Sequence, residues 1–213
     1  MDRDRLNQQL QLGIEALGLD LPETAVPQLL DYLALLIKWN AHFNLTAVRD
    51  PGDMVARHLL DSLAVLPHVR GRSLADLGSG AGLPGIPLAL ARPDLDVTLI
   101  DSNGKKVRFL RAVVRELELE RVEPVQARVE ELDARFDTLT TRAFASLADM
   151  LAWGGHLLAP GGRVLALKGR YPADELQALR APFRLADALP LSVPGLDAER
   201  HVLIIDRGAR QGT

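Results

Sequence analysis

The sequence predicts an α/β fold in which an N-terminal helical extension precedes a seven-stranded, mostly parallel sheet. From Ser73 onward, short apolar runs alternate with helical patterns, which is typical of stacked β–α units. Before Ser73, apolar residues recur at helical spacing. A glycine-rich segment, Asp76 to Gly85 with the sequence DLGSGAGLPG, begins at the end of the first predicted strand. The first two observations give the fold class, and the third places a candidate ligand site on it.

Length and composition restrict the possible functions. A chain of 213 residues with 47% hydrophobic content can bury one substantial core. Cysteine is absent, which excludes disulfides, thiolate metal sites and cysteine nucleophiles, and no metal site is predicted. The 25 basic and 28 acidic side chains give a net charge of −3, so a polyanionic partner must be met by a local patch. The start is charged and no apolar run approaches membrane-spanning length, so we expect a cytoplasmic protein without a membrane partner.

Residues 1–68 are expected to form a helical segment that packs on the rest of the chain. The first helix, at 2–17, carries leucine and isoleucine side chains at helical spacing. A second helix should begin near Pro22 and end near Phe43. A third is predicted from Asp53 to Leu66, and Pro67 should end it.

Residues 69–208 are expected to form the sheet domain. Strands are predicted near 73–77, 96–100, 122–126, 137–142, 163–168, 183–191 and 200–206. Helices are predicted after Gly85 and at 104–117, 146–158 and 173–180, with a short turn at 129–133. The sequence Pro160-Gly161-Gly162 predicts a tight turn before the fifth strand. Residues 209–213 should form a disordered tail.

The glycine segment has the composition of a cofactor cradle. Gly78, Gly80 and Gly82 remove side chains that would hold a ligand off the backbone, and they allow positive φ. A helix opening after them would aim free N–H groups at a bound polar group. The dinucleotide fingerprint requires a glycine where Leu83 stands. The segment therefore suits an adenosyl group or a small zwitterion as well as a pyrophosphate, and a purely structural turn is the alternative.

Asp101 is the candidate partner for a ribose. It ends the second predicted strand beside the glycine segment, at the edge where open α/β sheets bind ligands. A carboxylate there can accept hydrogen bonds from both hydroxyls of an unphosphorylated ribose. The alternative is that Asp101 caps the helix that begins near Asn103.

Seven segments together resemble one protein family. They are WNAHFNLTAVRD, RHLLDSLAVLP, DLGSGAGLPGIPLAL, LIDSNGKKVRFL, RVEEL, TRAFASL and GGRVLALKG, which run from about Trp39 to about Gly169. They are similar to signatures of the RsmG (GidB) family of S-adenosylmethionine-dependent 16S rRNA guanine-N7 methyltransferases. The resemblance implies the Rossmann-like sheet of class I methyltransferases and S-adenosyl-L-methionine as cofactor. It also implies 16S rRNA in the 30S subunit as partner, with guanine 527 as the target. Nothing in the sequence suggests an obligate protein partner, so we expect a monomer.

The resemblance also implies which residues bind the cofactor. Gly78 and Leu83 match contact positions of the family's glycine turn, Val129 and Glu130 match a pair beside the adenine, and Arg142 matches an arginine that ends the fourth strand. Glu130 is equally compatible with an exposed, solvated turn. Burying Arg142 without a partner would be costly, so it should meet an anion. That anion could be the cofactor carboxylate, an RNA phosphate or a structural aspartate such as Asp76.

Methylation at N7 requires little from catalytic side chains. N7 of guanine carries an in-plane lone pair and no proton, so in-line transfer requires no general base, and no catalytic residue is assigned. The sequence lacks a cysteine for a covalent adduct and an Asn-Pro-Pro-aromatic motif for amine methylation. Alignment of two bound substrates can supply roughly 7–11 kcal/mol. Asp61 or Glu130 could face the positive charge that develops on the purine.

A basic helix face is the candidate RNA contact. Lys105, Arg108, Arg111 and Arg115 fall on one side of the predicted helix 104–117, opposite Val107, Leu110, Val114 and Leu117. Lys168, at the end of the fifth strand, should contact phosphate, and Arg57, His58 and Arg170 could extend the patch. The basic face could also be ordinary solvated surface, and His58 and Trp39 fit a protein interior.

Two other functional classes are compatible with such a fold. A nucleotide-dependent oxidoreductase is disfavoured by Leu83 and by the lack of a Tyr-Lys or similar hydride site. A noncatalytic ribosome-assembly factor is disfavoured because the cradle glycines and Asp101 are intact.

Overall fold

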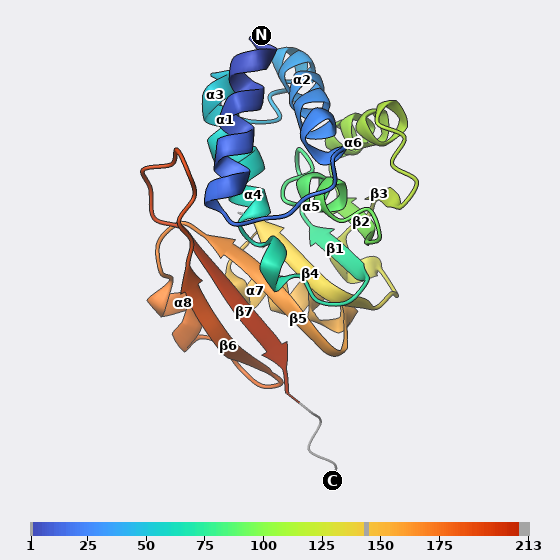
Figure 1. Ribbon diagram of the computed structural model, residues 1–213. Helices are drawn as coiled ribbons and strands as arrows, with labels where there is room; N and C mark the ends of the chain where they lie inside the picture. The colour runs from blue at the N-terminus through green and yellow to red at the C-terminus, as the bar shows by residue number, and fades with distance from the viewer. Residues whose placement is uncertain (1, 143–144, 209–213) are drawn as a thin grey trace.

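The computed structural model describes residues 2–142 and 145–208 and contains one seven-stranded sheet. The strand order is β3-β2-β1-β4-β5-β7-β6 (Figure 1). β7 runs antiparallel to both of its neighbours, and the other pairings are parallel. The predicted seven-stranded, mostly parallel sheet is therefore confirmed. The predicted tail at 209–213 lies outside the described residues.

Each strand overlaps a segment that the sequence predicts. The strands are β1 (Ser73–Leu77), β2 (Asp96–Asp101), β3 (Val122–Gln126), β4 (Phe136–Arg142), β5 (Leu158–Lys168), β6 (Phe183–Pro190) and β7 (His201–Arg207). Leu74, Ala75 and Leu77 of β1 are fully buried, as expected for a parallel strand covered on both faces.

The start of β5 corrects two predictions. The helix predicted at 146–158 ends earlier, and a 3₁₀ turn, Gly155–Leu157, leads directly into β5 at Leu158. The predicted turn at Pro160-Gly161-Gly162 lies inside the strand. A Cβ on Gly162 would lie 2.7 Å from the carbonyl oxygen of Asp137, so glycine is required where β5 passes β4 closely. The glycines thus serve an irregular strand pairing, whose register shifts between Phe136 and Thr138.

The helices also match the predicted order. They are α1 (Arg3–Ala16), α2 (Ala25–Phe43), α3 (Pro51–Met54), α4 (Asp61–Leu63), α5 (Gly85–Ala91), α6 (Gly104–Glu116), α7 (Leu147–Gly154) and α8 (Ala173–Gln177). The helix predicted at 53–66 is one helical stretch whose middle, Val55–Leu60, is π-helical. In Figure 1 the arrowheads of β1, β4 and β5 point toward this stretch and the other N-terminal helices.

Two hydrophobic clusters cover the two faces of the sheet. The larger cluster joins side chains of the N-terminal helices, such as Leu10 and Leu33, to Leu74 and Leu99 of the sheet. The smaller one packs Leu147 and Met150 of α7 and other side chains against the opposite face. The N-terminal helices therefore share a core with the strands.

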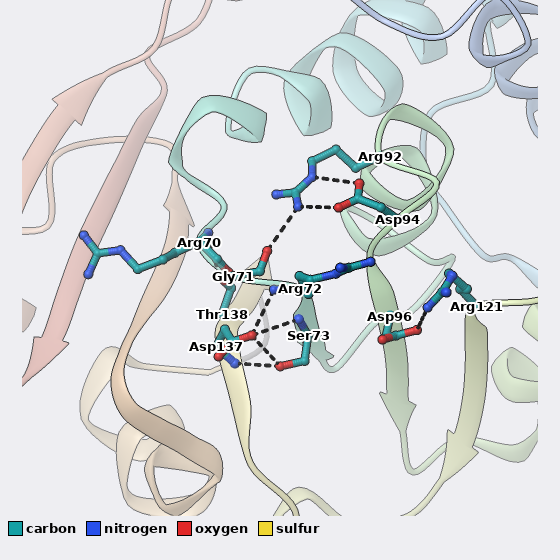
Figure 2. A network of polar contacts seen from close by, with 10 residues as sticks. All are labelled: Arg70, Gly71, Arg72, Ser73, Arg92, Asp94, Asp96, Arg121, Asp137 and Thr138. Atoms are coloured by element: carbon teal, nitrogen blue, oxygen red, sulfur yellow. Dashed lines mark hydrogen bonds and ion pairs between the residues drawn. The ribbon is translucent and has the colours of Figure 1, made fainter.

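A polar network fixes the amino end of the sheet (Figure 2). Asp137 Oδ2 accepts hydrogen bonds from the backbone N–H groups of Arg72 and Ser73 and from the Ser73 hydroxyl, at 2.9 to 3.1 Å. These hydrogen bonds hold the pKa of the Asp137 carboxyl below its usual value. The entry into β1 is thereby tied to β4, which sets the position of the glycine turn at the other end of β1.

Candidate functional site

A cavity of about 470 Å³ lies at the carboxyl ends of β1, β2 and β3. Its lining includes Gly78, Asp101, Lys106, Val129, Glu130 and Trp153. The cavity lies at the edge where open parallel sheets bind ligands. The structure thus brings together residues that are separated by more than 70 positions in the sequence.

The glycine turn adopts the backbone conformation that its sequence predicts. Gly78, Gly80 and Gly82 have φ values of 68°, 59° and 89°, a region that other residues rarely adopt. Apart from its two chain neighbours, the nearest atom to a Cβ placed on Gly80 is the Gly78 carbonyl oxygen, 3.8 Å away. A Cβ on Gly82 would instead lie 2.6 Å from the Ile86 side chain, inside the core. Gly80 therefore borders open space, whereas Gly82 permits close packing.

Asp101 connects the glycine turn to the second strand. Its Oδ2 accepts a hydrogen bond of 2.9 Å from the Gly80 N–H, and its Oδ1 accepts one of 2.8 Å from the Asn103 N–H. The Lys106 ammonium lies 3.6 Å from Oδ2. The side chain that caps α6 is Asn103, which accepts from the Lys105 N–H at 3.0 Å. The alternative of Asp101 as the helix cap is therefore wrong.

Asp76 organises the other side of the turn from within the core. The carboxylate is completely buried and accepts hydrogen bonds from the Gly85 N–H at 3.1 Å and the Thr140 hydroxyl at 3.2 Å. Burial raises the pKa of Asp76 to about 6, and these hydrogen bonds oppose the rise. The Gly85 N–H at the start of α5 is therefore bonded to Asp76. Leu83 is 4% exposed and packs in the core, so its predicted cofactor contact stays a prediction.

A second 3₁₀ turn, Val129–Glu131, and α7 form another part of the cavity lining. Val129 is buried, and Glu130 beside it is exposed and lies 3.7 Å from the Arg128 guanidinium. Trp153 of α7 is 41% exposed and lines the same cavity. Sequence reasoning missed Trp153, because an aromatic residue in an apolar helical pattern looks like a core residue. Its exposure in the folded chain is the signal that distinguishes it.

A second cavity, of about 480 Å³, lies over the ends of β4 and β5, and Arg142 is in its lining. Arg142 Nη1 donates to the carbonyl oxygen of Arg57 at 3.0 Å and to Asp61 Oδ2 at 3.2 Å. Arg200 Nε donates to Asp61 Oδ1 at 2.9 Å. Arg142 therefore has a structural carboxylate as partner, but that carboxylate is Asp61 and not Asp76.

Lys168 also lines the second cavity, where it is already paired. Its ammonium lies 2.8 Å from a carboxylate oxygen of Glu175 in α8. Glu175 Oε2 also accepts a hydrogen bond from the Leu147 N–H. The predicted contact between Lys168 and RNA phosphate stays a prediction, and this ion pair would compete with it.

His58 is buried, and Trp39 is partly buried against the hydrophobic core. His58 is 5% exposed, and its Nε2 lies 2.8 Å from the Thr46 hydroxyl. Burial and then the Arg142 charge lower the pKa of His58 to about 4, so its imidazole is neutral at neutral pH. The Trp39 ring packs against Phe109 of α6, with centroids 5.6 Å apart. The interpretation of His58 as an interior residue is confirmed, and Trp39 packs against the core with part of its surface exposed.

The basic face of α6 is exposed. Lys105, Arg108, Arg111 and Arg115 all point to solvent, while Val107 and Leu110 are fully buried and Val114 and Leu117 are partly buried. The predicted helix with one basic and one apolar side is confirmed. The binding of RNA to the basic side stays a prediction.

Over residues 2–142 and 145–208, the structure contains no group of three or more side chains that could hold a metal ion. In that same part of the chain, every helix is too short or too polar to cross a membrane.

Comparison with solved structures supports the fold. A SAM-dependent methyltransferase from Aquifex aeolicus superposes with a TM-score of 0.58 at 16% identity, covering 76% of this chain and 96% of that one. TrmN from Thermus thermophilus superposes with a TM-score of 0.55 at 20% identity, covering 72% of this chain and 53% of that one. The predicted Rossmann-like fold of class I methyltransferases is therefore confirmed.

Comparison of sequences identifies the family. A protein from Alkalilimnicola ehrlichii named ribosomal RNA small subunit methyltransferase G is 54% identical over 95% of this chain and 93% of its own length. A protein of the same name from Pseudomonas syringae pv. tomato is 50% identical over 95% of this chain and 97% of its own length. The family model described as rRNA small subunit methyltransferase G, or GidB, matches residues 25–203. This chain belongs to the rRNA small subunit methyltransferase G (GidB) family.

Proposed function

We propose that this protein transfers a methyl group from S-adenosyl-L-methionine to N7 of guanine 527 of 16S rRNA in the 30S subunit. The observation that carries the proposal is the cavity in which Asp101 binds the backbone of the glycine turn. The names of the relatives support ribosomal RNA of the small subunit as the substrate. The choice of N7 and of guanine 527 rests on the family resemblance.

The residues that line the first cavity fit S-adenosyl-L-methionine. The cavity volume falls in the range typical of small-molecule sites. Gly78 leaves the backbone open, and the Asp101 carboxylate has lone pairs beyond the two that its backbone hydrogen bonds use. Val129 offers an apolar surface to an adenine, and Trp153 adds an aromatic one. The cofactor, when bound, supplies an electrophilic methyl group on sulfur.

The protein's own contribution is alignment of the two substrates. N7 carries no proton, so no side chain has to remove one. Holding both substrates in a near-attack arrangement supplies roughly 7–11 kcal/mol in well-oriented reactions. Both carboxylate oxygens of Asp61 are bonded to arginines, so we assign Asp61 to positioning Arg142. Glu130, exposed at the first cavity, is the remaining candidate to face the charge that develops on the purine.

RNA binding is assigned to the charged residues around the cavities. We assign phosphate contacts to Lys105, Arg108 and Arg111, which form the exposed face of the helix that follows β2, and to Lys168, which lines the second cavity. Residues 1–68 would form the helical segment that packs on the methyltransferase domain, 69–208. A ribosomal substrate places the enzyme in the cytoplasm, where we propose that it acts as a monomer.

The decisive experiment maps methylation on 16S rRNA. The purified protein is incubated with S-adenosyl-L-methionine and 30S subunits from cells that lack this gene, and the rRNA is mapped by mass spectrometry. We expect one new methyl group, at N7 of guanine 527. An unmodified guanine 527, or binding of NADH in place of S-adenosyl-L-methionine in calorimetric titration, would overturn the proposal. Naked 16S rRNA in a parallel reaction shows whether the assembled subunit is required.

A further inference from the structure

The second cavity has a charge distribution that favours an anion. Four cationic side chains contribute to its lining, and Asp61 is the carboxylate among the lining residues. These cations are Arg57, Arg142, Lys168 and Arg200. His58 is also in the lining but adds no charge at neutral pH, because its pKa is lowered to about 4. The walls therefore carry a net positive charge, which attracts anions.

Asp61 holds two of these arginines without using all of their donors. Asp61 is 2% exposed, and the side chains of Arg142 and Arg200 are 23% and 24% exposed. Within the described residues, the hydrogen bonds of Arg142 use Nη1, and those of Arg200 use Nε and Nη1. Each guanidinium has five N–H donors, so donors remain on both. Two like charges are thus held together with free hydrogen-bonding capacity, which suits a phosphate group.

The position of Arg142 connects this cavity with the first one. β1 and β4 are parallel neighbours, and Leu77 pairs with Thr141. Gly78 and Arg142 follow these residues at the same level of the sheet, on strands spaced about 4.8 Å apart. A ligand on Arg142 would therefore lie next to a ligand that rests on Gly78. This relation is the one that a methyl acceptor requires toward a methyl donor.

The cavity also has an apolar side. Val48 and Leu167 line it, together with the four cations. Apolar surface beside paired guanidinium groups matches a nucleotide, which presents a flat base and a phosphate. A free inorganic anion would make no use of the apolar wall.

We propose that the second cavity binds one nucleotide of the RNA substrate, with its phosphate on Arg142 and Arg200 and its base against Val48 and Leu167. The role of the nucleotide as part of the substrate rests on the proposed function. Asp61 acts as a positioning residue, because it keeps the two guanidinium groups together. Arg200, which precedes β7, is thereby a substrate-binding residue contributed from the end of the chain that is remote from the glycine turn.

The test uses guanosine 5′-monophosphate, guanosine and inorganic phosphate as probes, titrated into the full chain by calorimetry with S-adenosylhomocysteine present. We expect the nucleotide to bind at least tenfold more tightly than either the nucleoside or inorganic phosphate. Arg200→Gln should weaken nucleotide binding at least tenfold and change the affinity for S-adenosylhomocysteine less than twofold. Arg121→Gln, an exposed arginine paired with Asp96 at the opposite end of the sheet, is the matched control and should change neither affinity.

Arg57→Gln provides a second variant, since the exposed side chain of Arg57 can be removed while its carbonyl still accepts from Arg142. It should weaken nucleotide binding even if Arg200→Gln fails to fold. Equal binding of nucleotide and nucleoside, or wild-type nucleotide affinity in either folded variant, would overturn the inference. If the wild type still methylates 30S subunits in that case, the proposed function stands and only this binding site is lost. If the wild-type protein does not methylate 16S rRNA, the proposed function itself is overturned.

Discussion

The Tyr32 hydroxyl donates a hydrogen bond of 2.7 Å to the carbonyl oxygen of Ala81, which ties α2 to the glycine turn. Tyr32 is completely buried, and burial raises the pKa of its hydroxyl, so the group remains a donor. Without this hydrogen bond, the buried Ala81 carbonyl oxygen would lose its donor, which costs free energy. The N-terminal extension thus supports the backbone of the glycine turn.

Replacement of Tyr32 by phenylalanine should loosen this support. The variant keeps the ring in the core and removes only the hydroxyl, so we expect a loss of about 1–3 kcal/mol in the free energy of unfolding. The affinity for S-adenosyl-L-methionine should fall as well, because the turn is no longer held. Chemical denaturation and calorimetric titration measure the two effects. Tyr171→Phe, at an exposed tyrosine, is the control; unchanged cofactor affinity in Tyr32→Phe would show that the turn holds its shape without α2.

Substitutions at Gly80 and Gly85 should separate cofactor binding from folding. Around Gly80 an added side chain meets open space, so Gly80→Ala costs about 1–2 kcal/mol for its positive φ and Gly80→Arg fills the cradle. At Gly85 a Cβ would overlap the Leu99 side chain and lie 2.9 Å from Asp76. We expect Gly80→Arg to fold but not to bind S-adenosyl-L-methionine. We expect Gly85→Ala to fold poorly. Circular dichroism measures folding, and calorimetric titration measures binding. Wild-type binding by Gly80→Arg would move the cofactor site away from the turn.

Asp101→Asn should lower cofactor affinity at least tenfold while the fold survives. Asp101 accepts one backbone N–H on each carboxylate oxygen, and an amide offers a single acceptor oxygen. Either the Gly80 N–H or the Asn103 N–H would then face the NH₂ group of the asparagine, which is itself a donor. Asp96→Asn on the same strand is the matched control, because Asp96 is exposed and far from the cavity lining. If the two variants bound S-adenosyl-L-methionine with equal affinity in calorimetry, Asp101 would not be a cofactor-binding residue.

The fold could be predicted because its signals are local. Most of the strands are short apolar runs next to a helical pattern, and both patterns can be recognised within a few residues of sequence. The prediction of a turn at Gly162 fails for a physical reason, since the lack of a side chain allows either a turn or a close approach of two strands. Only the neighbouring strand, far away in sequence, decides between the two.

The parts of the candidate site that depend on local sequence could also be predicted. The glycine turn and Asp101 lie at strand ends, and strand ends follow from the local pattern. The partner of Arg142 does not follow from the local pattern. Asp61 lies 81 residues earlier in the sequence and contacts Arg142 only when the N-terminal helices pack on the sheet. Trp153 likewise depends on tertiary packing, which leaves it at the cavity instead of in the core.

The basic face of α6 should control the salt dependence of RNA binding. Replacing Lys105, Arg108 and Arg111 by glutamine removes up to three phosphate contacts, so the slope of log K against log salt should flatten by about 0.7 for each contact with single-stranded RNA. Cofactor affinity should stay unchanged, because these side chains do not line the cavity. Arg121→Gln with Arg135→Gln, on other exposed surfaces, is the control. An unchanged slope would identify the face as ordinary solvated surface.

Two buried groups should give opposite pH dependences of stability. Asp76 has its pKa raised from 3.8 to about 6, so its contribution to stability is full below pH 3.8 and is lost as pH rises to about 6. His58 has its pKa lowered from 6.5 to about 4, so its contribution is full above pH 6.5 and is lost as pH falls to about 4. Between these limits the two trends oppose each other in the wild type.

Single variants separate the two trends. Asp76→Asn keeps an acceptor for the Gly85 N–H and removes the buried charge, so its stability relative to the wild type should rise between pH 4 and pH 6, by up to about 3 kcal/mol. His58→Gln should gain stability relative to the wild type as pH falls from 6.5 to 4, because it no longer excludes a proton. Urea denaturation at several pH values measures both differences. If both variants changed in the same direction with pH, Asp76 and His58 would not be the groups that titrate, because burial shifts an acid and a base oppositely.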